Sequence, residues 1–264
     1  MRLLPLTVAP DRTFTKEDTM RTTLRTASRV TPRPEPTRAG SLVRRHPSAV
    51  GRWVGAVGVS GFLVAGVVTG LVTPAYDLRR EAVSGLAALD SAHAGWMIAG
   101  FAAGAVGLVA SAVVLWQAVP QRAARVAAGL VAAAGALIGV AGFARQDCSD
   151  QLPACKDFGE AVEASGSYWV HQYASLLAFL MLLVSFFLLT RGLRRTGHSP
   201  LAVISLTVGV ACGTGVALLV VAPPFVVDNY GILQRGVIGA LFGWPVVAGI
   251  LASRAVSAPS TSPL

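Results

Sequence analysis

The stretch Gly95–Ala118, which reads GWMIAGFAAGAVGLVASAVVLWQA, decides the fold class of this protein. It contains no charged residue and is long enough to cross the roughly 30 Å hydrocarbon core of a bilayer as a helix. Its apolar residues run without interruption and include many alanines and glycines, whereas a membrane β-strand alternates polar and apolar residues over about ten positions. We therefore predict that this stretch is a transmembrane helix.

Five further stretches of similar length are equally apolar and free of charge. The composition of the whole chain agrees, because 53% of its 264 residues are hydrophobic, only 13% are charged and the mean hydropathy is +0.61. This excludes an ordinary soluble domain, a disordered chain and a disulfide-rich secreted protein. We predict an all-α, polytopic integral membrane protein with a six-helix transmembrane domain at residues 52–254 and a short flexible tail at 255–264. The other five predicted helices are Trp53–Thr73, Val126–Ala144, Tyr168–Thr190, Leu201–Val221 and Gly236–Ser253.

Residues 1–51 form a separate unit that is rich in basic residues and proline. Half of the 22 lysines and arginines of the chain lie in residues 1–52. We predict a disordered cytoplasmic tail that is attracted to anionic lipid headgroups, and this placement explains the net charge of +9 without any nucleic-acid binding. The apolar run after Arg2 is too short for a secretory signal. Met20 is an alternative start of translation.

The loops between the predicted helices differ in charge, and this difference predicts the orientation. The second and fourth loops carry only basic charges, at residues 122–125 and 191–195, whereas the other three loops contain every acidic residue outside the tail. Placing the basic loops and both termini in the cytoplasm puts 17 of the 22 lysines and arginines inside, as the positive-inside rule requires. We predict a multi-pass plasma-membrane protein with cytoplasmic N and C termini.

Pairs of glycines four residues apart occur in four of the predicted helices. Such pairs allow the backbones of neighbouring helices to approach closely in lipid. We expect them to make contacts within the bundle, and a dimer interface is the alternative. The pairs are Gly100 and Gly104, Gly135 and Gly139, Gly209 and Gly213, and Gly239 and Gly243.

Two of the three cysteines lie in the third loop, in the sequence Cys148-Ser-Asp-Gln-Leu-Pro-Ala-Cys155. Their spacing allows a small ring, and the predicted orientation places them on the oxidising side of the membrane, so we predict a Cys148–Cys155 disulfide. The alternative is a metal site with Asp147 or Asp150, although this spacing is wider than that of common zinc knuckles. Cys212 lies within a predicted helix, where a single thiol usually fills space as a small apolar group.

No Asp, Glu, Lys or Arg lies in the middle of any predicted helix, which weakens the case for a pump or a proton-coupled transporter. Polar residues lie instead at the predicted outer ends of the helices, and in a compact bundle we expect them to converge on one outward-facing pocket. We expect Arg235 to anchor its helix by pairing with Asp228 or Asp77. The candidate site residues are Asp77, His93, Asp147, His171, Gln234 and Arg235.

Two histidines and one carboxylate are the minimum for a zinc ion that activates water. His93, Asp147 and His171 are therefore an alternative metal site, although the chain contains no His-Glu-x-x-His motif. The simpler expectation is that the protein holds no cofactor and that these histidines cap helices or bind loop carboxylates.

Three short motifs point to a family. They are Phe143-Ala-Arg-Gln-Asp147-Cys148 after the third helix, Tyr168-Trp-Val-His171-Gln at the start of the fourth, and Gly231-Ile-Leu-Gln234-Arg235 before the sixth, with Trp244 beyond. Over residues 53–254 the chain resembles the prokaryotic membrane proteins, common in actinobacteria, that are grouped as domain of unknown function 998. The resemblance implies a six-helix integral membrane protein and brings no established activity.

Three classes of function remain open. We favour a non-enzymatic membrane protein whose outer polar patch and third loop contact a lipid, a small ligand or a partner. The first alternative is a membrane-embedded, metal-dependent hydrolase acting on a lipid-like substrate. The second is a small transporter built from two inverted three-helix halves, although the sequence shows no internal repeat.

Overall fold

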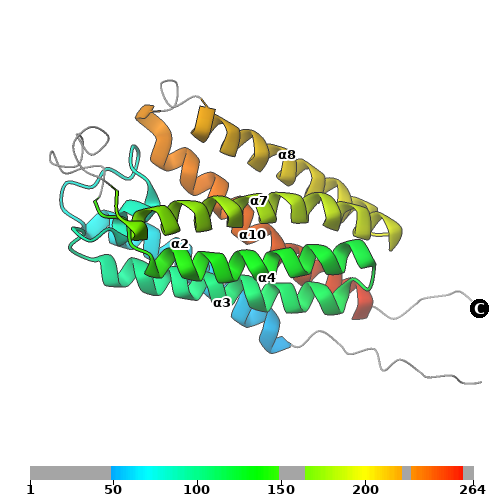
Figure 1. Ribbon diagram of the computed structural model, residues 1–264. Helices are drawn as coiled ribbons and strands as arrows, with labels where there is room; N and C mark the ends of the chain where they lie inside the picture. The colour runs from blue at the N-terminus through cyan, green and yellow to red at the C-terminus, as the bar shows by residue number, and fades with distance from the viewer. Residues whose placement is uncertain (1–48, 149–163, 222–226, 258–264) are drawn as a thin grey trace, which may run out of the picture. The chain divides into compact units, whose positions relative to one another are not determined.

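The structure is a computed structural model that describes residues 49–148, 164–221 and 227–257 (Figure 1). Within these ranges it contains six long α-helices, two short 3-10 helices and no strand, which confirms the predicted all-α class. Each long helix is apolar enough and long enough to cross a membrane. The long helices are α2 (Ala49–Val72), α3 (Ala94–Ala118), α4 (Arg122–Phe143), α7 (Gly166–Arg195), α8 (Ser199–Val221) and α10 (Tyr230–Ser257).

Several helices extend beyond the apolar stretches that predicted them. α7 continues to Arg195, and α10 begins at Tyr230, before the predicted start at Gly236. Charged residues at helix ends do not interrupt a helix, because long basic side chains reach the headgroup region and favour the negative end of the helix dipole. The predicted tails at 1–51 and 255–264 lie mostly outside the described residues.

Local sequence signals set the two ends of α7. At its start, the Ser165 side chain accepts a hydrogen bond from the backbone N–H of Tyr168, which satisfies one of the free donors of the first turn. At its end, Gly197 has a φ of 81°, and the N–H of His198 donates to the Leu193 carbonyl at 2.9 Å. This is the Schellman ending, which glycine adopts without steric cost.

The six helices pack in chain order around a ring, and α10 also reaches across it to α3 (Figure 1). α10 is the most buried span, with 61% of its apolar window buried, and α8 is the least buried, with 22%. α8 packs mainly on α7 and α10, whereas α7 and α10 touch each other little. A space near α8 is therefore left between α7 and α10.

Small residues allow the backbones of α2 and α3 to pack directly against each other. A Cβ atom added at Gly107 would lie 2.6 Å from the backbone nitrogen of Val59, and one at Gly58 would lie 2.7 Å from the Gly107 Cα. Among the predicted glycine pairs, Gly100 contacts α2 and Gly135 contacts α3, which confirms contacts within the bundle at these positions. The pairs in α8 and α10 differ, since a Cβ at their second glycines, Gly213 and Gly243, would meet nothing within 4 Å.

A buried hydrogen-bond chain links α7, α8 and α10 in the middle of the bundle. The Trp244 indole nitrogen donates to the Ser205 hydroxyl at 3.0 Å, and Ser205 donates to the Phe186 carbonyl at 3.1 Å. Both donors would otherwise be unsatisfied in an apolar surrounding, which explains why these polar groups are paired.

The two ends of the bundle differ in character. The α3–α4 and α7–α8 connections lie at the same end as the start of α2 and the end of α10, and we call it the arginine end (Figure 1). The opposite end carries the 3-10 helices η1 (Val83–Ala87) and η2 (Val227–Asn229), and we call it the capped end. The arginine end is defined by Arg52, Arg122, Arg125, Arg191, Arg194, Arg195 and Arg254.

Candidate functional site

The connection between α2 and α3 folds over the capped end of the bundle. Its central segment η1 is buried, and the side chains of Leu86 and Ala87 are almost completely inaccessible to solvent. We call residues 77–89 the cap. An apolar segment at this position closes the bundle, but it also buries backbone groups that need hydrogen-bond partners.

Arg235, near the start of α10, holds the first half of the cap. One terminal nitrogen of its guanidinium donates to the carbonyls of Leu78 and Glu81, both at 2.9 Å. The other donates to the Tyr76 hydroxyl at 2.6 Å, and that hydroxyl donates to the Ala82 carbonyl at 2.7 Å. Arg235 thus anchors α10, as predicted, but it does so through backbone carbonyls and a tyrosine.

The expected carboxylate partners of Arg235 bind a different arginine. In the part of the chain that the structure describes, Arg80 pairs with Asp228 at 2.9 Å and with Asp77 at 3.8 Å. The predicted pairing of Arg235 with either carboxylate was wrong. The reason is geometric, because the buried carbonyls of the cap require a donor with several N–H groups, whereas the two carboxylates are exposed to water.

Arg145, just past the end of α4, holds the second half of the cap. It donates to the Ala87 carbonyl at 3.0 Å and to the Ala88 carbonyl at 2.7 Å. The backbone N–H of Leu89 donates to the Gln146 carbonyl at 3.0 Å alongside. The sequence indicated Arg145 only as a charge of the third loop and as part of the motif at residues 143–148. Its position directly after an apolar helix was the signal for an anchoring role.

His171 lies in the first turns of α7 and is 2% exposed. Its Nδ1 lies 2.7 Å from the Ala141 carbonyl and 3.1 Å from the Ala144 carbonyl, at the end of α4. Because both partners are acceptors, we assign the proton to Nδ1 in the neutral ring, which leaves Nε2 as an acceptor. The ring also packs edge-on against Phe101, with centroids 6.1 Å apart. His171 therefore caps α4 and joins it to α7.

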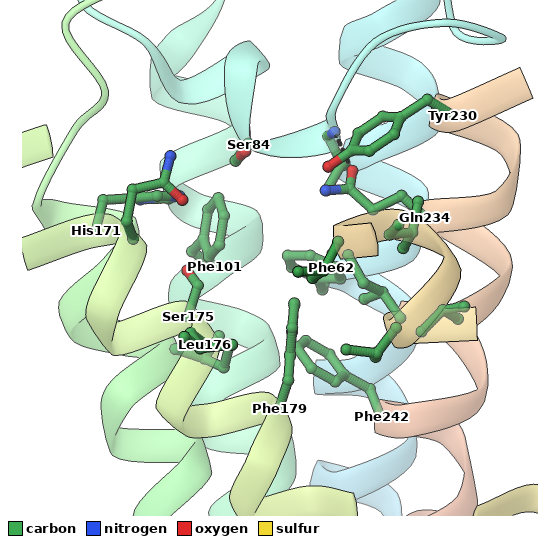
Figure 2. A pocket seen from close by; sticks show the side chains of 18 residues that line it. Phe62, Ser84, Phe101, His171, Ser175, Leu176, Phe179, Tyr230, Gln234 and Phe242 are labelled. Atoms are coloured by element: carbon green, nitrogen blue, oxygen red, sulfur yellow. Dashed lines mark hydrogen bonds between the residues drawn. The ribbon is translucent and has the colours of Figure 1, made fainter. Parts of the chain in front are cut away.

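Gln234 joins the cap to a pocket. Its side-chain oxygen accepts a hydrogen bond from the backbone N–H of Val83 at 2.8 Å, at the start of η1. The same side chain lines a cavity of about 170 Å³ beneath the cap. Figure 2 shows Gln234 and Tyr230 on one side of this cavity, His171 on the other and Ser84 above.

The pocket is polar near the cap and aromatic below it (Figure 2). Neither part has a formally charged side chain, since no Asp, Glu, Lys or Arg is among its lining residues. Phe62 lies between Phe101 and Phe242, with ring centroids 5.3 and 5.1 Å apart. The polar lining side chains are Ser84, His171, Gln172, Ser175, Tyr230 and Gln234, and the phenylalanines are Phe62, Phe101, Phe179 and Phe242.

The wall of the pocket between α7 and α8 reaches the lipid-facing surface. Leu176 on α7 and Val220 on α8 both line the pocket, yet they are 45% and 66% exposed. Both helices lie in the apolar part of the chain, so this side of the pocket faces the bilayer. The arrangement can admit a molecule that approaches from lipid.

The six candidate site residues do not form one cluster. His171 and Gln234 line the pocket, and Arg235 lies beside it under the cap. Asp77 is at the exposed edge of the cap, where it accepts a hydrogen bond from the backbone N–H of Arg79. The other two are His93, whose ring lies 5.6 Å from that of Trp96, and Asp147, which accepts hydrogen bonds from the N–H and hydroxyl of Ser165 at 2.8 and 2.6 Å.

The described residues supply no set of ligands for the predicted alternative zinc site. Within residues 49–148, 164–221 and 227–257, no three His, Cys, Asp or Glu side chains gather closely enough to hold a metal ion. His171 binds backbone carbonyls and Asp147 binds Ser165, so these two side chains have structural partners. The zinc alternative thus depends on the sequence pattern alone.

The predicted disulfide involves Cys155, which lies outside the described residues together with Asp150. The Cys148–Cys155 bond therefore stays a prediction. Cys212 is a buried free thiol in α8, in agreement with its predicted role as an apolar filler.

Six membrane-length helices closed by an anchored cap define a polytopic helical membrane protein with an internal pocket. The family described as "Protein of unknown function (DUF998)" matches residues 41–251, and the chain belongs to this family. This confirms the resemblance found in the short motifs, whereas the actinobacterial origin stays a prediction. No curated protein and no solved structure matches the chain.

Proposed function

We propose that this protein is a non-enzymatic membrane protein that binds an uncharged amphiphile in the pocket beneath the cap. One observation carries the proposal, namely the uncharged polar side chains that line the capped end of a cavity with a phenylalanine floor. The Arg235 and Arg145 anchors support it, because they fix the cap that forms the roof of the pocket.

The lining favours an uncharged headgroup. A charged group moved from water into this pocket would lose hydration and find no side chain of opposite charge. A hydroxyl, amide or ester group would instead find both donors and acceptors, including the Nε2 acceptor of His171 and the amide of Gln234. We therefore propose a ligand with such a head, for example an acylglycerol or a fatty alcohol.

The size of the pocket limits how much of the ligand it holds. An engineered apolar cavity of about 150 Å³ binds benzene, so a cavity of about 170 Å³ accepts a head and a short part of one chain. The rest of the ligand would extend between Leu176 and Val220 into the bilayer. A lipid could enter by this route without leaving the membrane.

The test is binding of dioctanoylglycerol to the full chain in detergent, followed by native mass spectrometry. Ser175→Phe fills the pocket, and Ser60→Phe is the matched control because Ser60 lies on the exposed surface of α2. We expect Ser175→Phe to lower binding at least tenfold and Ser60→Phe to leave it unchanged. Equal binding by both variants, or a loss of dioctanoyl phosphatidic acid binding in Ser175→Phe as large as the loss of dioctanoylglycerol binding, would contradict the proposal.

The metal-dependent hydrolase has a separate test. Elemental analysis of the purified protein should find less than one zinc ion per ten chains, both in the wild type and in His171→Asn. About one zinc per wild-type chain that is lost in the variant would replace our proposal with the hydrolase.

We further propose that the protein lies in the plasma membrane with the arginine end in the cytoplasm. The excess of arginines at this end supports this orientation. Intact cells treated with an impermeant thiol reagent should label Ala92→Cys and not Ser199→Cys, because both positions are exposed, at the capped end and at the arginine end respectively. The reverse pattern would invert the orientation. The predicted attraction of the tail at residues 1–51 to anionic lipids is part of the same proposal. Residues 1–48 of this tail lie outside the described residues.

A further inference from the structure

We infer that the arginine end carries a binding site for the phosphate headgroup of an anionic phospholipid. The site is a hollow of about 520 Å³ beside the last turns of α7 and the first turns of α8. It is independent of the pocket beneath the cap, which lies at the opposite end of the bundle. The residues that line it are Phe187, Thr190, Arg191, Arg194, Arg195 and Leu206.

Three arginines give the hollow a concentrated positive charge. Arg191, Arg194 and Arg195 lie three and four positions apart on α7, so their side chains share one side of the helix. All three are exposed, and in the described residues no acidic side chain forms an ion pair with them. Residues 164–227 contain no acidic residue at all. An anion in the hollow would relieve the mutual repulsion of the three guanidinium groups.

Arginine suits phosphate in particular. Its planar guanidinium presents parallel N–H donors that match two phosphate oxygens, and it stays charged at every physiological pH. Thr190 is not available as a further donor, because its hydroxyl donates to the Phe186 carbonyl at 2.8 Å. The headgroup contacts therefore come from the arginines.

The apolar part of the hollow selects a lipid over a soluble phosphate. Phe187 lies one turn before Arg191 and is 47% exposed, and Leu206 on α8 completes the floor. Val184, one turn further into the membrane, is also exposed on α7. The same side of α7 thus changes from apolar to basic within one turn, which matches the change from acyl chain to phosphate in a phospholipid at the membrane interface.

The experiment measures phosphatidylglycerol binding to the full chain by native mass spectrometry, with phosphatidylcholine and glycerol phosphate as comparison probes. Arg191→Gln with Arg194→Gln removes two charges from the hollow. Arg122→Gln with Arg254→Gln removes two exposed charges from the same end, outside the hollow, and is the matched control. Leu206→Trp fills the hollow without changing the charge. Gel filtration and thermal melting show that each variant is folded.

A basic residue near an anionic lipid contributes about fivefold in affinity, so the double variant in the hollow should bind phosphatidylglycerol about 25-fold more weakly. The control should stay within twofold of the wild type, Leu206→Trp should also weaken binding, and glycerol phosphate should not compete. Equal weakening by the two double variants would overturn the site, since charge at this end alone would then explain binding. An unaffected Leu206→Trp variant, or competition by glycerol phosphate, would overturn the assignment to a lipid.

Discussion

Replacing Arg235 with glutamine should loosen the cap more than any other single charge change at this end of the bundle. The guanidinium donates to the carbonyls of Leu78 and Glu81 and to the Tyr76 hydroxyl. Hydrogen bonds from a charged donor contribute about 1.5–3 kcal/mol each, and they are not additive when they share one nitrogen. We therefore expect Arg235→Gln to lower the free energy of unfolding by about 3 kcal/mol.

The matched control is Arg80→Gln, at an exposed arginine that pairs with two exposed carboxylates. Such surface pairs contribute at most about 1 kcal/mol. With a shift of roughly 2–4 °C per kcal/mol for a protein of this size, Arg235→Gln should lower the melting temperature in detergent by about 6–12 °C. The melting temperature of Arg235→Lys should lie between those of Arg235→Gln and Arg80→Gln, because lysine keeps the charge and lacks the planar set of donors.

Hydrogen exchange supplies the local measurement. In the half of the cap that Arg235 holds, the amide of Glu81 donates to the Asp77 carbonyl and the amide of Gly85 donates to the Ala82 carbonyl. Their exchange should become faster in Arg235→Gln and stay as in the wild type in Arg80→Gln. Equal melting temperatures and equal exchange for the two variants would refute the role assigned to Arg235.

Three further predictions concern the bundle and the loop between α4 and α7. Gly107→Ala should destabilise the protein by about 1–3 kcal/mol in thermal melting, because its Cβ would meet α2 backbone, whereas Gly129→Ala has open space and should melt like the wild type. Trp244→Phe should cost about 0.6–1.7 kcal/mol by losing the indole hydrogen bond to α8, and an unchanged melting curve would contradict this. Cys148 and Cys155 should react with an impermeant thiol reagent on intact cells only after reduction, and labelling without a reductant would exclude the disulfide.

The six helices could be predicted from the sequence because the bilayer imposes one length and one composition on each span. The stretch Gly95–Ala118 and the observed helix Ala94–Ala118 differ by one residue at the start. The ends of α7 and α10 were harder to predict, since charged residues there lie in the headgroup region and remain helical.

The candidate site was predicted only in part. His171 and Gln234 do line one pocket, because each lies near the start of its helix at the capped end, where a compact bundle brings side chains together. The phenylalanine floor could not be predicted, since Phe62 and Phe242 are 180 positions apart and look like ordinary core residues in the sequence. Apart from the Tyr76 hydroxyl, the partners of Arg235 and Arg145 are backbone carbonyls, which every residue has, so residue types gave no indication of them.

The most direct test of the central claim is to locate a bound uncharged lipid along the chain. The measurement is photo-crosslinking of the full protein in membranes with a diacylglycerol that carries a diazirine near its headgroup, followed by peptide mass spectrometry. We predict crosslinks to the residues of α7 and α8 that line the pocket, and their loss in Ser175→Phe. These residues are Gln172, Ser175, Leu176 and Phe179 of α7, and Val216, Leu219 and Val220 of α8. Crosslinks spread over the exposed faces of all six helices, and unchanged by Ser175→Phe, would contradict the account.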